Sequence, residues 1–143
     1  MPGVASLEAT QFYAFPRNAF WKIMGALFAA GPELDYPSRL QKIMANHIAL
    51  WDVIEACHRP GSLDSAISES GLVTNNFQSF FRQHALITHV FFNGQKAAGL
   101  FKKMVSPGLA GQFSYHTLPS TSPANAASNY AAKLEAWSVL KTV

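Results

Sequence analysis

Two segments of the chain carry residue types that could bind a planar, polar substrate. The first, Tyr13-Ala-Phe-Pro-Arg-Asn-Ala-Phe-Trp21, places aromatic rings beside an arginine and an amide. The second, Leu118-Pro-Ser-Thr-Ser-Pro-Ala-Asn125, carries three hydroxyls between two prolines. An aromatic ring offers a rigid π face, an amide can position a water molecule, and hydroxyls with backbone N–H groups can hold phosphate. The chain therefore has the groups needed to bind a flat ring and an anion.

Asn18 is the most informative single residue of the first segment, and two interpretations of it are open. An amide in the first turn of a helix commonly satisfies backbone donors that lack a partner, and its position alone favours that role. The same amide could instead position a water molecule or bind a substrate. Tyr13 and Phe15 are open in the same way, because their rings could cover the core or form a flat platform for a flipped-out base.

The second segment also has a structural and a functional interpretation. Proline, serine and threonine are typical of turns, so the loop could simply connect a strand to a helix. Alternatively, its hydroxyls could hold phosphate while a small or apolar tip enters a stack of bases. The candidate residues for this contact are Pro119, Ser120, Thr121, Ser122, Pro123 and Asn125, together with Arg17 of the first segment.

The remaining polar residues offer neither a metal centre nor a catalytic triad. Cys57 is the only cysteine, which excludes an internal disulfide and a four-cysteine metal site. His116 is expected to be structural, and the other four histidines lack the spacing of metal ligands. Arg59, Ser62 and Asp64 are expected to form a hydrogen-bonded loop, with recognition of a base edge as the alternative. We expect no metal and no cofactor.

The composition is typical of one globular domain. Of 143 residues, 49% are hydrophobic and 13% are charged, which is enough for a sizeable core and unlike a disordered chain. The net charge of +3 allows nucleic acid as a partner without establishing it. No apolar run is as long as a membrane span, and no leader pattern opens the chain. We expect a single cytoplasmic domain over residues 1–143.

Helical and extended patterns alternate along the chain. Helical spacing covers residues 20–28, 39–45, 77–81, 94–104 and 130–140, and strand-like apolar runs cover 48–54, 88–92 and 113–118. Pro16 and Gly31 fit the start and the end of the first of these helices, and residues 57–70 are typical of a loop. The alternation predicts an α/β fold, with a short, mostly parallel sheet covered by helices on both faces. Ligands bind at the carboxyl ends of such strands, where we place Asp52, Asn93 and the second segment.

Together these segments resemble the uracil-DNA glycosylase superfamily, whose fold is a three-layer αβα sandwich. Residues 13–22 are similar to a stretch of mismatch-specific uracil and thymine glycosylases, in which an aromatic residue stacks on the base before a Pro-x-Asn-x-Phe-Trp helix start. Leu118-Pro-Ser-Thr-Ser is similar to the motif that pinches the DNA backbone and fills the gap left by the flipped base. The resemblance to the hypoxanthine-DNA glycosylase family covers nearly the whole chain. It extends through Ile48-Ala-Leu-Trp-Asp-Val, Arg59-Pro-Gly-Ser-Leu-Asp-Ser65, Phe91-Phe-Asn-Gly94 and Leu118–Asn125.

The resemblance implies a monofunctional, monomeric glycosylase without a cofactor. Such an enzyme flips deoxyinosine out of double-stranded DNA and hydrolyses its N-glycosidic bond, which passes through an oxocarbenium-like sugar and leaves an abasic site. Carried over residue by residue, Asn18 takes part in catalysis and Tyr13 stacks on the base. The base pocket would include Tyr13, Phe15, Asp52, Asn93, Pro2 and Gly3. The DNA would be held by Arg17, Pro119, Ser120, Thr121, Ser122, Pro123 and Asn125.

Departures from the family pattern limit these expectations. Phe15 stands where the family often has histidine, which bears on base specificity more than on the reaction class. Met1 stands where uracil and thymine enzymes keep a water-activating Asn, and no apolar strand precedes Pro2-Gly3. Because that strand is central in the superfamily sheet, we expect it to lie upstream, with Met1 an internal residue. The alternatives are a uracil or mismatch glycosylase, and a DNA-binding relative with impaired catalysis.

Overall fold

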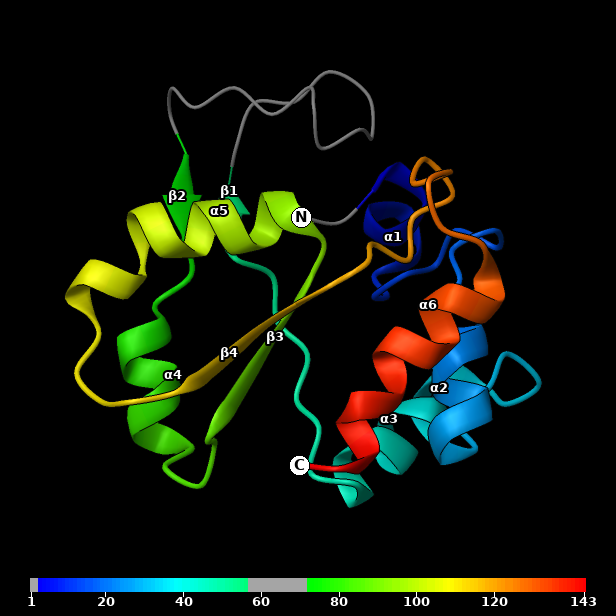
Figure 1. Ribbon diagram of the computed structural model, residues 1–143, viewed down its shortest axis with the longest axis horizontal. Helices are drawn as coiled ribbons and strands as arrows, with labels where there is room; N and C mark the ends of the chain where they lie inside the picture. The colour runs from blue at the N-terminus through cyan, green and yellow to red at the C-terminus, as the bar shows by residue number, and fades with distance from the viewer. Residues whose placement is uncertain (1–2, 57–71) are drawn as a thin grey trace. The chain divides into compact units, whose positions relative to one another are not determined.

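The computed structural model describes residues 3–56 and 72–143, which form two compact units (Figure 1). As far as they are described, the first unit contains residues 52–120 and the second contains residues 3–51 and 121–143. The second unit is therefore built from two separate stretches of the chain. Among the described residues, no helix is both long enough and apolar enough to cross a membrane.

A short parallel sheet organises the first unit. Strand β3 (His89–Asn93) pairs with β4 (Ser114–Leu118) in parallel, and Phe91 lies opposite His116. The chain returns from β3 to β4 through α5 (Gln95–Met104), because parallel neighbours need a crossover connection. The prediction of an α/β fold with a short parallel sheet is confirmed in this unit.

The other elements of the first unit lie before and within this crossover. Strands β1 (Ile54–Ala56) and β2 (Val73–Thr74) form a separate antiparallel pair. Helix α4 (Phe77–Gln83) precedes β3, and the 3-10 helix η2 (Ser106–Gly108) follows α5. The antiparallel pair was not among the expected strands, because β2 is too short to show an alternating pattern.

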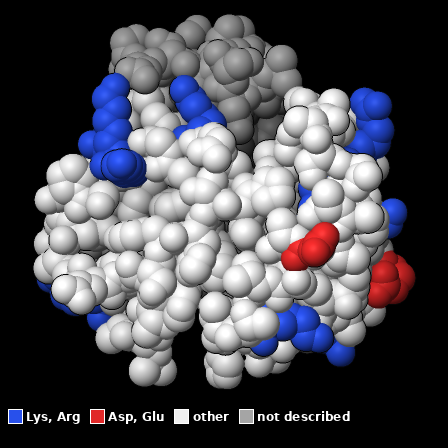
Figure 2. Space-filling model, viewed as in Figure 1, with Lys and Arg blue, Asp and Glu red and all other residues white. Residues whose placement is uncertain are grey.

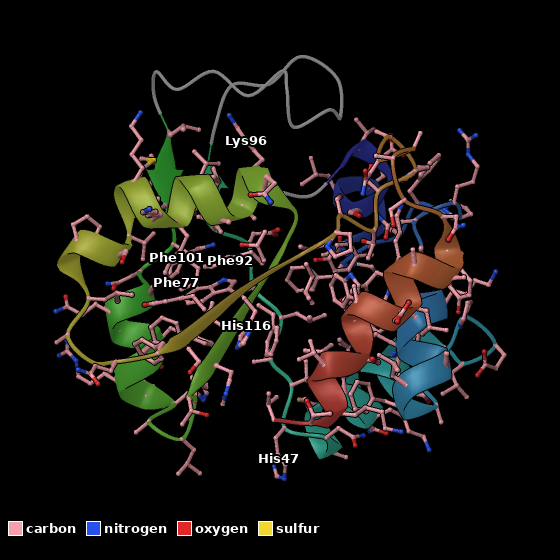
Figure 3. The ribbon with its side chains drawn as sticks, in the orientation of Figure 1. His47, Phe77, Phe92, Lys96, Phe101 and His116 are labelled. Atoms are coloured by element: carbon pink, nitrogen blue, oxygen red, sulfur yellow. The ribbon has the colours of Figure 1, made fainter. Side chains whose placement is uncertain are left out.

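Three phenylalanines form the centre of the first unit's core. The ring of Phe101 contacts Phe92 at a centroid distance of 5.0 Å and Phe77 at 5.2 Å. Figure 3 shows these rings pointing toward one another from β3, α4 and α5. Among the described residues, the buried cluster contains Val53, Ile54, Phe77, Phe92, Leu100, Phe101 and Val105.

The described part of the second unit is helical. It contains α1 (Val4–Ala9), α2 (Phe20–Phe28), α3 (Tyr36–Ala45), α6 (Tyr130–Trp137) and the 3-10 helix η3 (Ser138–Lys141). Edge-to-face contacts join these helices: Phe20 packs on Trp137 at 5.8 Å, and Trp21 on Tyr36 at 5.9 Å. Side chains at helical spacing in α2, including Ile23 and Met24, are fully buried, as the sequence pattern predicts.

Helix boundaries follow local capping chemistry more closely than the sequence pattern. Asp35 begins α3 by accepting a hydrogen bond from Ser38 N–H at 2.8 Å, which moves the start of that helix ahead of residue 39. Helix α2 ends at Ala29, whose left-handed φ of 57° replaces the glycine expected for such an end. Gly31 lies two residues further on.

Other expectations need correction or fall outside the description. The predicted strand over residues 48–54 is wrong, because regular pairing begins only at Ile54, where β2 supplies a partner. Helix α1 was not expected at all. The predicted loop at 57–70, with Cys57, Arg59, Ser62 and Asp64, lies outside the described residues. The single domain stays a prediction.

Candidate functional site

The first segment is held against α2 by its aromatic rings. Tyr13 has a left-handed backbone, with φ of 55°, and its half-buried ring stacks on Phe20 at a centroid distance of 4.0 Å. The carbonyl of the preceding residue, Phe12, accepts a 2.9 Å hydrogen bond from Trp21 Nε1. A left-handed conformation outside glycine costs about 1–3 kcal/mol and persists only where surrounding contacts hold it. These contacts therefore fix the position of the Tyr13 ring, as a stacking surface requires.

Asn18 performs the structural role that its position favours, with hydrogen-bonding capacity to spare. Its Oδ1 accepts a hydrogen bond from Phe20 N–H at 3.0 Å, and its own N–H donates to the Phe15 carbonyl at 2.9 Å. The residue is half-buried, and no partner for Nδ2 is recorded among the described residues. An amide oxygen can accept a second hydrogen bond. Asn18 can therefore still bind a water molecule or a substrate.

Arg17 lies over Phe15 at the surface. The guanidinium carbon is 5.3 Å from the ring centroid, within range of a cation–π interaction, and Phe15 is 40% exposed. On the face seen in Figure 2, the Lys and Arg side chains are scattered over both units rather than gathered into one patch. Contact with phosphate would therefore depend on individual cations such as Arg17, and on neutral donors.

The second segment begins in the first unit, at the carboxyl end of β4. Gly94 N–H donates to the Leu118 carbonyl at 3.0 Å, which joins the ends of β3 and β4. Gly94 has a φ of 100°, and a Cβ added there would lie 3.1 Å from the Cβ of Ser120. The chain therefore passes close to Gly94 as it leaves the sheet at Pro119 and Ser120. A larger residue at position 94 would be strained.

The segment continues into the second unit, where it is tied to the first segment. The Thr121 carbonyl accepts a 3.0 Å hydrogen bond from Ala19 N–H, in the residue directly after Asn18. Thr121 is 1% exposed, so this link is buried. The structure therefore brings the amide segment and the start of the hydroxyl loop together within one unit.

A tight turn follows Thr121. Asn125 N–H donates to the Ser122 carbonyl at 3.0 Å, and Ala124 N–H donates to Ser122 Oγ at 3.2 Å. Pro123 and Ala124 are exposed at the tip. The turn predicted from its residue types is therefore present, and its tip is small and apolar.

Two polar residues that the sequence did not single out support these segments. Lys133 in α6 is 5% exposed, and its Nζ donates to the carbonyls of Ser122 at 3.3 Å and Asn125 at 3.1 Å. Ser6 in α1 is 7% exposed, and its Oγ accepts from Ala14 N–H at 3.0 Å, directly after Tyr13. Lysine and serine are mostly exposed in proteins, so a sequence pattern gives no signal for their burial.

The other expected pocket residues are spread over both units. Gly3 precedes α1 as its extended N-cap, and Pro2 lies outside the described residues. Asn93 is the half-buried last residue of β3, as predicted. Asp52 was expected at or near the carboxyl end of a strand, and that placement is wrong because it precedes β1. Its main-chain carbonyl accepts a 2.7 Å hydrogen bond from Asn75 Nδ2.

Two titratable side chains have distinctive surroundings. Hydrogen bonds from the Ser38 hydroxyl and N–H hold the pKa of the Asp35 carboxyl below its usual value. The ring of His116 stacks on Phe91 at 4.7 Å, and its Nε2 is buried without a partner among the described residues. No group of three His, Cys, Asp or Glu side chains in the described ranges could hold a metal ion.

An open hollow of about 430 Å³ lies elsewhere in the second unit. Its lining includes Phe28, His47 and Lys141, at the C-terminal end of α2 (His47 is labelled in Figure 3). Asn18 precedes the opposite end of that helix. The hollow is therefore separate from the two segments, and the candidate site rests on the segments themselves.

Comparison with known proteins identifies relatives, although no family model matches the chain. A protein of Methanosarcina acetivorans named hypoxanthine DNA glycosylase is 32% identical over 127 residues, which are 87% of this chain and 76% of the relative. A protein of Methanosarcina barkeri with the same name is 32% identical over 98 residues, which are 68% of this chain and 61% of the relative.

A solved structure extends the likeness to three dimensions. The solution NMR structure of a candidate uracil DNA glycosylase from Methanosarcina acetivorans matches with a TM-score of 0.73 and 27% identity, over 98% of this chain and 86% of that one. The predicted fold class, αβα with a small parallel sheet, is confirmed by this match. From the identity and coverage of these relatives, the chain belongs to the uracil DNA glycosylase-like family of DNA glycosylases.

Proposed function

We propose that the protein is a monofunctional DNA glycosylase, which hydrolyses the N-glycosidic bond of deoxyinosine in double-stranded DNA and acts as a monomer. The observation that carries this proposal is the buried hydrogen bond from Ala19 to Thr121, because it places the amide and aromatic segment beside the hydroxyl loop. The names of the two curated relatives support hypoxanthine as the released base.

The proposed reaction uses Tyr13 and Asn18. The flipped base stacks on the Tyr13 ring, which its contact with Phe20 holds in place. As the bond between C1′ and the purine breaks, its electron pair leaves with the base and the sugar becomes oxocarbenium-like. A water molecule bound to the second acceptor position of Asn18 Oδ1 attacks C1′ and releases a proton to solvent, while the departing base takes up a proton from solvent. Backbone donors stabilise the charge that develops on the purine.

The remaining site residues are proposed to hold the DNA and the base. Arg17 and the hydroxyls of Ser120 and Ser122 would contact phosphates, and the buried Thr121 would anchor their loop through its bond with Ala19. The exposed tip at Pro123 would enter the gap left by the base. Pro119 and Asn125 would set the two ends of that loop. Phe15, Asp52, Asn93, Pro2 and Gly3 are assigned to the base pocket.

Labelled duplexes that contain a single hypoxanthine, uracil or xanthine test this proposal. After incubation with the protein, alkali cleaves the strand at any abasic site. We expect release of hypoxanthine at a rate well above that of the other two bases. Binding without release from any duplex would contradict the enzymatic proposal and leave a DNA-binding relative.

Uracil is the second candidate base, because the matching solved structure is described as a candidate uracil DNA glycosylase. The second ground is Phe15, which stands where the family often has histidine. Its ring lies under the guanidinium of Arg17, and this different side chain would change the contacts with the base. Preferential release of uracil in the same assay would favour this alternative while leaving the reaction class unchanged.

A further inference from the structure

We propose that Lys133 is a positioning residue for DNA binding. From within the second unit its ammonium clamps the turn at residues 122–125, so that the exposed tip, Pro123 and Ala124, is already in the conformation that enters DNA. This inference rests on the proposed function, which assigns that turn to the DNA. Figure 1 shows the turn in the orange loop that leads into α6, the helix that carries Lys133.

The burial of Lys133 is unusual for its residue type. Lysine is almost never fully buried unless it is paired, because its ammonium loses the hydration that it has in water. Lys133 is 5% exposed, and both of its recorded acceptors are neutral main-chain carbonyls, those of Ser122 and Asn125. A methionine or leucine could fill the same space without this cost. We therefore explain the burial of this ammonium by its two hydrogen bonds to the turn.

The place of Lys133 in α6 gives independent support. Asn129 caps this helix by accepting from Ala132 N–H at 2.9 Å, and Lys133 N–H donates to the Asn129 carbonyl at 3.0 Å. Lys133 is thus at the end of the first turn, where the positive end of the helix dipole disfavours a cation. A lysine at this position does not stabilise the helix, but it does form two hydrogen bonds to the turn.

The two hydrogen bonds act on the turn at both of its ends. The Ser122 carbonyl already accepts from Asn125 N–H, and the bond from Lys133 adds to it while a second bond holds the Asn125 carbonyl. Thr121 is fixed separately by Ala19. Without Lys133 the tip would have to be ordered during binding, which weakens affinity. Because its side chain is only 5% exposed, we infer that Lys133 does not itself neutralise a phosphate.

The decisive comparison is between Lys133→Met and Lys141→Met, which removes an exposed lysine from η3 in the same unit. Both lose one positive charge, but only the first loses the clamp. Affinity for an abasic-site duplex is measured over a range of salt concentrations. We expect Lys133→Met to bind at least about 10-fold more weakly with an unchanged salt slope, and Lys141→Met to bind as the unmodified protein does. A slope smaller by about one would mean direct phosphate contact and would overturn the positioning role.

Kinetics and hydrogen exchange separate positioning from a general structural effect. At saturating DNA, Lys133→Met should release base within about threefold of the normal rate, because the loss is in binding. Exchange of the Asn125 amide should accelerate while amides in α2 stay protected. If Lys133→Met does not fold, Lys133→Gln, which keeps a donor, replaces it and should show a smaller loss of affinity. Normal affinity in the folded variant would refute the inference.

These readouts distinguish the inference from the proposed function. DNA binding that depends on Lys133, with no base release by the unmodified protein, would support the positioning role and refute the enzymatic proposal. Base release that is unaffected by Lys133→Met at limiting DNA would support the enzymatic proposal and refute the positioning role. Failure of the unmodified protein to bind any duplex would refute both.

Discussion

The Oδ1 atom of Asn18 lies 3.0 Å from the N–H of Phe20, which donates a hydrogen bond to it. The bond spans only two residues, so it orients the amide relative to the first turn of α2. The side-chain ring of Phe20 in turn stacks on the ring of Tyr13. A substitution at Asn18 therefore affects the start of the helix as well as the proposed chemistry, and an informative variant must separate the two effects.

Asn18→Ala should lower the single-turnover rate of base release by about 100-fold or more, because a preorganised polar group at the reacting centre contributes on this scale. It should also destabilise the protein by about 0.5–2 kcal/mol through the lost helix-start bond. Asn18→Ser keeps an oxygen acceptor for Phe20 N–H, so its unfolding temperature should stay near normal. Its single-turnover rate of base release should fall as much as that of Asn18→Ala. A fast Asn18→Ser enzyme would show that the amide is not needed.

Tyr13→Leu should weaken base recognition, whereas Tyr13→Phe should not. Leucine fills much of the same volume but has no π face, and stacking of one base is worth about 1–3 kcal/mol, or about 5- to 150-fold in affinity. The phenylalanine variant keeps the ring that packs at 4.0 Å on Phe20. Base-release kinetics at limiting and saturating duplex measure the effect, and equal activity of the two variants would argue against a stacking role.

Gly94→Ala and Gly99→Ala should change stability in opposite directions. Alanine at Gly94 is strained by the φ of 100° and would bring a Cβ within 3.1 Å of Ser120, so a loss of about 1–3 kcal/mol is expected. Gly99 is exposed within α5, and an added Cβ meets nothing within 4 Å. Alanine there should stabilise the helix by up to about 1 kcal/mol. Urea denaturation of both variants measures the difference.

Asp35→Asn should reduce stability at neutral pH but not in strong acid. The folded pKa of Asp35 is lowered by its hydrogen bonds with Ser38. A lowered pKa means that the charged form stabilises the fold above the ordinary value of 3.8, and that this contribution is lost as the pH falls through the folded pKa. Asparagine keeps the capping acceptor without the charge. Thermal unfolding of both proteins from neutral pH to about pH 2 should show their difference vanish in acid.

The sequence predicts those parts of the fold that bury one face of a regular element. Helix α2 is found from its apolar spacing because Phe20, Ile23 and Met24 are all buried. Helix α1 gives no such signal, since Val4 and Leu7 are 46% and 60% exposed and its buried residue is Ser6. Periodicity detects a buried apolar stripe, and α1 does not have one.

The candidate site divides in a similar way. The roles of Asn18 and Thr121 stay predictions from their residue types and surroundings, and the structure joins their segments through Ala19. Lys133 could not be found, because its role depends on two main-chain carbonyls that no side-chain pattern reveals. The placement of Asp52 failed because an apolar run does not specify where its pairing partner begins.

The link from Ala19 to Thr121 has a consequence for how the protein is made. A ribosome delivers residues 52–120, the whole of the first unit as described, before the second stretch of the other unit exists. Until that last stretch emerges, Ala19 lacks its acceptor and the core around Phe20 lacks Trp137. The nascent chain thus carries Asn18 and Tyr13 on a scaffold that is completed only once residues 121–137 have been made. A stop codon between residues 121 and 137 would keep residues 52–120 of the first unit but remove Trp137 from the core around Phe20.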